Sequence, residues 1–539
     1  MTTEAQRDAR DDRVSSWAPL RHRLFAFLFA AQLGSHIGSF FQVVAASWLM
    51  GDLNSSPTLV ALIQTASLMP VLLFGLVAGA LADIVDRRRL LIAAQAWMVS
   101  CAGVLTALTA LDLVTPATLL AMTFAMGTGA AMMGPAWQAI QPDLVPAHEF
   151  TQAVALSSVT FNTGRTIGPA LGGALVAAAS PAWAFAVNAV SFLGVLVVLV
   201  GWRPDHGSVR LARETLSGAL RVGWRYSANA PALRGVLIRT AAFAPAAAAI
   251  QALLPTVVRD RFGLGSGSFG LLLGCFGTGA VTAALLRPKL DAVLTRDQIV
   301  SSASIVVAAA MVITGTAGSA WAVGPALFVA GGAWTSATVT LNVSAQRVLP
   351  WWVRARGLGV YMVVLAGGIA IGSAVWGAIA AWSLTGAHIV AAATLVGGTL
   401  TRRRWRLDEA DRLDLRPAEP TSPMVLLEPD PETGPVLVTV AYRVAPERHV
   451  AFVTMMRLVE RDRRRSGASQ WGLFRDLADT DLFLETFVVD TWAEHMRQHQ
   501  RRTVAADVMM QEAREFVEGD VTVAHLLSAY APRAVGRTE

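Results

Sequence analysis

Long runs of apolar residues without charge constrain this chain more than any other feature. The run from Pro57 to Ala82 contains no Asp, Glu, Lys or Arg, and neither does the run from Leu90 to Leu111. A helix that rises ~1.5 Å per residue needs ~20 apolar residues to cross a ~30 Å hydrocarbon core. Both runs are long enough, so the sequence predicts membrane-spanning helices.

The composition agrees with a membrane class. Of the 539 residues, 54% are hydrophobic and only 15% are charged, a balance that would be hard to keep soluble. The net charge of +6 comes mostly from arginines beside the apolar runs, so membrane topology explains it better than a nucleic-acid partner. Cys101 and Cys275 lie in separate apolar runs without ligand-spaced neighbours, which favours small core residues over a disulfide or a metal site.

Further charge-free runs continue along the chain. Three of them contain turn formers, at 180–181, 315–324 and 384–386, where we expect a loop between two helices. Cutting the runs there predicts an all-α polytopic membrane protein with twelve spans in two six-helix halves. The predicted organisation is a cytoplasmic N-terminal segment (1–23), a first half (24–202), a cytoplasmic inter-half loop (203–232), a second half (233–401), a linker (402–435), a soluble domain (436–533) and a tail (534–539).

The distribution of arginines predicts which side of the membrane each loop faces. They are dense in the N-terminal segment and after the second, sixth, eighth, tenth and twelfth spans, whereas the alternate loops hold only Arg259 and Arg261. By the positive-inside rule, both termini lie in the cytoplasm. The polar N-terminal segment precedes a run too long for a signal-peptide core, so we expect it to stay uncleaved.

The segment from Gly79 to Arg89, between the second and third spans, carries both signs of charge. It resembles the cytoplasmic loop between the second and third helices of the major facilitator superfamily, whose pattern is roughly G-x-L-A-D-R-x-G-R-[RK]. Gly79, Asp83, Arg87 and Arg88 match the pattern, while two other positions depart from it. The resemblance implies a short loop in which these four residues gate the carrier and Asp83 acts as a conformational latch. Alternatively, the arginines set topology and Asp83 is a solvated charge.

Arg165 lies in the middle of an otherwise charge-free run, near the predicted bilayer midplane. An arginine there costs ~2.5–3.5 kcal/mol on insertion scales, so we expect it to face the bundle interior or a watery cavity. Asn162, one turn earlier, shares its face. No acidic residue lies mid-span as a partner, which suits an anionic substrate. A structural arginine bonded to neutral polar groups is an equal alternative.

Other polar residues within the spans are candidates for substrate contact or for interhelical hydrogen bonds. Gln32 and His36 belong to this group, and His36 is also a candidate proton site because histidine titrates near physiological pH. A helix-packing motif follows Arg165, consisting of Gly168, Pro169, Gly172 and Gly173. It resembles the G-P-x-x-G-G pattern on the fifth helix of superfamily antiporters, which is associated with export.

After Thr401 the composition predicts a separate domain. Its pattern reads as strand 436–444, helix 446–465, strands 470–477 and 482–489, a helix capped by Thr491 and Glu494, helix 504–518 and strand 521–527. This β-α-β-β-α-β order predicts a ferredoxin-like α+β domain. It resembles the dimeric α+β barrel of antibiotic-biosynthesis monooxygenase-like domains, and we expect a regulatory or dimerising role.

His495 and His499 are four residues apart on one predicted helix, which is metal-ligand spacing. No third ligand neighbours them, and the arginines on either side of His499 favour a solvated face. The sequence therefore predicts no metal site, and without a cofactor fingerprint it predicts no cofactor.

Four features of the chain together resemble the transmembrane secretion effector group of the major facilitator superfamily. They are the spans, the loop variant 82–89, the segment 162–173 and an appended domain containing 471–476. The resemblance implies a transporter, not an enzyme, in the bacterial inner membrane. It would export a small siderophore-like or drug-like metabolite, often anionic or amphipathic, by proton antiport. No G-x-x-x-x-G-K-[ST] motif indicates an ATP-driven pump. A multidrug antiporter, an uptake carrier and a membrane-tethered monooxygenase remain as alternatives.

Overall fold

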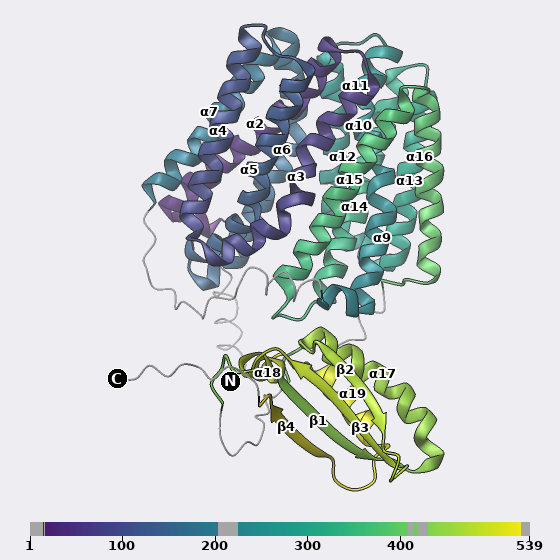
Figure 1. Cartoon of the computed structure of the whole chain (residues 1–539). Coiled ribbons are helices and arrows are strands. Elements are labelled where there is room, and N and C mark those ends of the chain that lie inside the picture. The colour runs from purple at the N-terminus through teal and green to yellow at the C-terminus, as the bar shows by residue number, and fades with distance from the viewer. Residues whose placement is uncertain (1–14, 16, 203–224, 408–413, 419–428, 530–539) are drawn as a thin grey trace, which may run out of the picture. The chain divides into compact units, whose positions relative to one another are not determined.

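The computed structural model describes residues 15, 17–202, 225–407, 414–418 and 429–529 (Figure 1). The predicted N-terminal segment, inter-half loop, linker and tail lie wholly or partly outside these residues. The chain divides into two compact units. The helical unit comprises Met1–Leu216, Ile238–Asn342 and Tyr361–Trp405, and the second unit comprises Ser217–Leu237, Val343–Val360 and Arg406–Glu539 and contains the four-stranded sheet.

Long helices follow the predicted apolar runs. Those of the first half are α2 (Arg23–Leu53), α3 (Pro57–Ile84), α4 (Arg87–Ala110), α5 (Pro116–Ile140), α6 (Phe150–Ala178) and α7 (Pro181–Gly201). The second half begins with α9 (Pro231–Ala247), which continues through α10 (Ala249–Ala252), α11 (Leu254–Thr256) and the π-helical turn η4 (Val257–Arg261). The remaining helices are α12 (Ser266–Val293), α13 (Arg296–Thr316), α14 (Ala320–Arg347), α15 (Arg354–Ala380) and α16 (Leu384–Gly398).

The helix boundaries fall where the sequence contains turn formers. Pro57, Pro116 and Pro181 each stand in the first turn of a helix, where a missing N–H costs nothing and the fixed φ suits the helix. Thr295 begins α13 with a capping box, because its hydroxyl accepts from Gln298 N and the Gln298 side chain accepts from Thr295 N. All three predicted breaks inside the long runs separate two helices.

Eleven helices among the described residues are long and apolar enough to cross a membrane. The 29-residue helix α6 is not one of them, because Arg165, Asn162 and several hydroxyl side chains reduce its hydropathy. The described helices therefore establish a polytopic membrane protein but not the predicted count of twelve. On α7, Val190 and Val197 are 68% and 62% exposed while Phe192 is buried, so this helix presents an apolar face outward, as lipid requires.

The second unit contains the predicted α+β domain, called the sheet domain below. Its elements are β1 (Val436–Arg443), α17 (His449–Ser466), β2 (Gln470–Arg475), β3 (Leu482–Val489), α18 (Trp492–Gln500), α19 (Val504–Arg514) and β4 (Thr522–Leu527). The strands are antiparallel in the order β2-β3-β1-β4. That order is the one expected of a ferredoxin-like sheet.

One face of the sheet forms the core of the sheet domain. Val438 and Tyr442 of β1 and Phe487 of β3 are buried with Phe452 and Met456 of α17. This arrangement follows from the two-residue period of the strands, which places alternate side chains on one face. The opposite face remains partly exposed, at Phe474 (59%), Leu484 (37%) and Leu526 (49%).

Candidate functional site

Arg165 of α6 is surrounded by neutral groups. Its Nη2 donates hydrogen bonds to Asn162 Oδ1 at 3.3 Å and to Thr335 Oγ1 at 3.2 Å. Its Cζ lies 6.0 Å from the centroid of the Phe161 ring, within the range of a cation–π contact. Among the described residues, no carboxylate forms an ion pair with Arg165, so its positive charge is not neutralised there.

The Thr335 contact joins the two halves, because α6 belongs to the first half and α14 to the second. Phe161 also packs edge-on against the ring of His36 on α2, with 5.4 Å between the centroids. Two of the predicted substrate residues, His36 and Arg165, thus contact one phenyl ring, and a third, Asn162, accepts a hydrogen bond from Arg165. The sequence does not mark Phe161 or Thr335, since apolar residues and threonines are common in any span.

Gln32, the fourth predicted substrate residue, lies one turn before His36. Both side chains line a cavity of about 30 Å³ that also contacts α5 and α6. Gln32 Nε2 is buried there without an acceptor among the described residues. The volume suffices for a water molecule but not for a metabolite, and Arg165 is not part of the lining. The four predicted substrate residues therefore do not share one cavity. Gln32 and His36 line the small cavity, whereas Asn162 and Arg165 do not.

Helix α6 packs closely against α2 through glycines. All four residues of the predicted packing motif are buried: Gly168, Pro169, Gly172 and Gly173. A Cβ on Gly168 would lie 2.7 Å from Phe40 Cβ, and one on Gly164 would lie 2.7 Å from His36 Cβ. Nonbonded carbon atoms do not approach that closely, so glycine permits this helix spacing.

The predicted loop from Gly79 to Arg89 is mostly helical, and the expectation of a short loop over this whole segment is wrong. α3 continues to Ile84 and α4 begins at Arg87, so only two residues connect them. A single glycine costs a helix only ~1 kcal/mol relative to alanine, and no other residue before Ile84 breaks it. Gly79 has open space around its Cβ position. Asp83 lies in the last turn of α3, and its side chain is outside the described part of the chain.

Asp86 and Arg88 stabilise the connection between α3 and α4. Asp86 Oδ1 accepts a hydrogen bond from Arg89 N at 2.8 Å and so caps the first turn of α4. Arg88 donates from Nε to Leu199 O at 3.1 Å and from Nη2 to Val200 O at 2.7 Å, at the C-terminal end of α7. These carbonyls lack helical partners and carry partial negative charge, so Arg88 ties α4 to α7.

A second contact between the halves involves Asp52, near the end of α2. Its Oδ1 lies 2.9 Å from Arg259 Nη1 in the turn η4. The Arg259 guanidinium also lies over the Trp48 ring, with 5.9 Å from Cζ to the centroid. Both charged side chains are partly exposed, so this ion pair contributes only ~0–1 kcal/mol to the contact. The sequence marked Arg259 only as a sparse loop charge.

The core of the sheet domain contains a charged group. The fully buried Glu485 of β3 accepts hydrogen bonds from Arg463 Nε at 3.0 Å, Trp471 Nε1 at 2.9 Å and the Tyr442 hydroxyl at 2.8 Å. Burial alone would raise the pKa of the Glu485 carboxyl, but the Arg463 charge and the hydrogen bonds outweigh burial and hold that pKa below its usual value. The ionised pair Arg463–Glu485 therefore joins α17 to β3 of the sheet.

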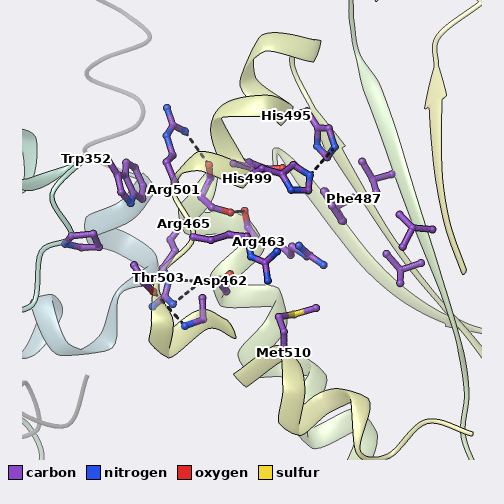
Figure 2. Close-up of a pocket in the computed structure, with 18 of the residues that line it drawn as sticks. Trp352, Asp462, Arg463, Arg465, Phe487, His495, His499, Arg501, Thr503 and Met510 are labelled. Carbon is purple, nitrogen blue, oxygen red and sulfur yellow. Dashed lines mark hydrogen bonds and ion pairs between the residues drawn. The ribbon is translucent and has the colours of Figure 1, made fainter. Parts of the chain in front are cut away.

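A cavity of about 510 Å³ lies beside this pair, and residues from the sheet and from α17, α18 and α19 contribute to its lining (Figure 2). His495 of α18 faces it and is only 2% exposed, so the solvated face predicted for this helix is wrong. Burial, followed by the charges of His499 and His525, lowers the pKa of His495 to about 3. His525 reaches the same place from β4, a neighbour that the sequence did not reveal.

Two characterised relatives share part of the chain. The staphyloferrin A transporter of Staphylococcus aureus is 27% identical over 270 residues, which is 49% of this chain and 66% of that protein. The enterobactin exporter EntS of Shigella boydii is 28% identical over 152 residues, or 28% of this chain and 36% of that protein. The chain thus spans slightly less than two thirds of the first of these relatives. Both relatives are transporters, not enzymes.

The solved structure of a POT family transporter in complex with 5-aminolevulinic acid matches 70% of this chain and 95% of that one, with a TM-score of 0.57 and 13% identity. At this identity the likeness shows the fold alone, which is that of a membrane transporter. The sequence pattern of the transmembrane secretion effector family matches residues 14–533. Because that match spans nearly the whole chain, the protein belongs to the transmembrane secretion effector family.

Proposed function

We propose that the protein is a secondary active transporter of the bacterial inner membrane that exports a small anionic or amphipathic metabolite by alternating access. The observation that carries this proposal is Arg165, a cation held between the two halves by the neutral groups of Asn162 and Thr335. A substrate carboxylate or phenolate at this place would gain a charge-assisted hydrogen bond. Relatives named for staphyloferrin A and enterobactin support a siderophore-like cargo.

Alternating access requires contacts between the halves that form in one state and break in another. We propose that the partly exposed pair Asp52–Arg259 is such a contact and that it closes one end of the carrier. We also propose that α6 is the twelfth span, because Arg165 meets polar partners inside the bundle and α6 packs between α2 and α12. Twelve spans with the arginine-rich loops inside would place both termini in the cytoplasm.

Proteoliposome counterflow tests the function. Vesicles preloaded with staphyloferrin A or enterobactin should accumulate the labelled compound, and a proton gradient should drive net movement if protons are the coupling ion. His36 is the proposed proton site, so His36→Gln should retain counterflow and lose the response to the gradient. Exchange of cationic drugs in place of both chelators would overturn the proposal in favour of a multidrug antiporter.

The proposed latch gives a prediction with a closely matched control. Replacing Asp83 by asparagine should slow transport by about tenfold, the effect of a ~1.4 kcal/mol change in the balance between two states. Asp86→Asn is the control, because asparagine caps a helix as well as aspartate does, and transport should persist. Initial rates at equal protein density measure both variants. Equal transport rates for Asp83→Asn and wild type would contradict the latch and leave the segment from Gly79 to Arg89 with a role in membrane topology only.

We further propose that the sheet domain pairs with a second copy of itself through its exposed face. Phe474, Leu484 and Leu526 make that face apolar, and the core-forming helix α17 packs on the other face. Leu484→Glu should convert a dimer in detergent into a monomer, as measured by light scattering. Val450→Glu, at an exposed position of α17, should remain dimeric. A monomeric wild-type protein would refute the pairing.

A further inference from the structure

Three histidines converge in the sheet domain from two elements. His495 and His499 lie one turn apart on α18, and His525 lies on β4. One ring nitrogen of each lies within 4.8 Å of those of the other two. The Nε2 atoms of His495 and His499 are 3.3 Å apart (Figure 2). We propose that this cluster is a binding site for a first-row transition-metal ion.

The fold determines the convergence. His525 pairs with Val438 in the β1–β4 register, so its side chain lies on the core face of the sheet. Trp492, at the start of α18, packs against both elements, with ring centroids 5.3 Å from His495 and 6.1 Å from His525. Trp492 is 3% exposed, so a rigid, buried side chain holds the two histidines at a centroid distance of 4.9 Å.

The distances suit a tetrahedral ion. Zinc binds imidazole nitrogen at ~2.0–2.1 Å, and two nitrogens 3.3 Å apart at these bond lengths subtend an angle of about 104–111° at the metal, a range that includes the tetrahedral value. His525, which is only partly buried, would complete three ligands after a side-chain rotation that brings its ring nitrogen closer to the other two. Three ligands from the protein leave a position for water or another ligand.

The chemistry of the group selects the metal class. The three donors are imidazoles, which suit Zn²⁺, Ni²⁺, Co²⁺ and Cu²⁺, whereas Ca²⁺ and Mg²⁺ prefer oxygen. All three histidines line the 510 Å³ cavity, so the open coordination position faces space for a further ligand.

The test uses the full-length protein in detergent, purified without an oligohistidine tag and stripped with a chelator. Equilibrium dialysis against buffered Zn²⁺ should show one tightly bound ion per chain, and Co²⁺ should give the intense visible absorption of four-coordinate cobalt. His499→Gln and His525→Gln should each weaken binding beyond the ~10- to 100-fold typical of outer-shell changes. Both positions are less buried than His495, so these variants are expected to fold.

His148→Gln is the matched control, because it removes one of nine histidines at an exposed position in the helical unit. It should bind Zn²⁺ and Co²⁺ as wild type does. Substoichiometric Zn²⁺ binding by the wild type, wild-type affinity in His525→Gln, or the weak absorption of six-coordinate Co²⁺ would each overturn the site. None of these results depends on transport, so they leave the proposed function to its own experiment.

Discussion

Arg165→Gln is expected to raise the Kd for an anionic substrate by at least about thirtyfold. Truncating one partner of a buried, hydrogen-bonded charge pair costs ~2–5 kcal/mol, and glutamine keeps the polarity and much of the length of arginine while removing the charge. The Kd of Arg165→Lys should lie between those of the wild type and Arg165→Gln, because lysine restores the charge without the planar guanidinium group. Binding to the purified protein and counterflow rates measure the effect.

The control for Arg165 is Arg287, which also contacts α14. Arg287 donates to Thr340 Oγ1 at 2.9 Å, but its charge is paired with Asp291 at 2.8 Å. A neutralised arginine should contribute little to anion binding, so Arg287→Gln should retain wild-type affinity. Unchanged affinity in Arg165→Gln would instead make Arg165 a structural residue bonded to neutral groups.

Glu485→Leu is expected to destabilise the sheet domain by about 3–5 kcal/mol, because it leaves Arg463 charged and without its buried partner. The double variant Glu485→Leu with Arg463→Met should recover most of this loss, since replacing both members of a buried ion pair by apolar residues is often neutral. Hydrogen–deuterium exchange of β1 and β3 in the full-length protein measures the local free energy of opening.

Glu460→Gln provides the comparison, because Glu460 pairs with Arg464 on the surface of α17 and such pairs contribute under ~1 kcal/mol. Acid provides an independent check. The folded pKa of Glu485 lies below its unfolded value of ~4.3. Its stabilisation is therefore complete above that pH and is lost as the pH falls through the folded value. If β3 exchanges equally in Glu485→Leu and wild type, the pair has no role in stability.

The sequence predicts the elements of the fold better than the contacts between them. The turn formers at 180–181 located the break between α6 and α7, because a proline in the first turn of a helix acts within one turn of backbone. The strand and helix order also predicted the ferredoxin-like sheet. The apolar run 57–82 agrees with α3, which ends at Ile84. The short loop expected from Gly79 to Arg89 was wrong, because one glycine rarely stops a long apolar helix.

The site residues that escaped prediction depend on distant pairing. Thr335 meets Arg165 only because α14 packs near α6, and His525 meets His495 only because β4 pairs with β1. Glu485 was not predicted either, although its position between Phe483 and Phe487 in the two-residue period of β3 places its side chain on the core face.

The polar character of α6 has a consequence for how the protein is made. An arginine near the middle of a helix raises the cost of entering lipid by ~2.5–3.5 kcal/mol, and two helices that pack against α6 are α2 and α12. α2 is synthesised before α6, but α12 begins only at Ser266, well after α6 ends at Ala178. We therefore expect nascent α6 to remain beside earlier helices until the second half emerges, which makes assembly of the two halves part of its insertion.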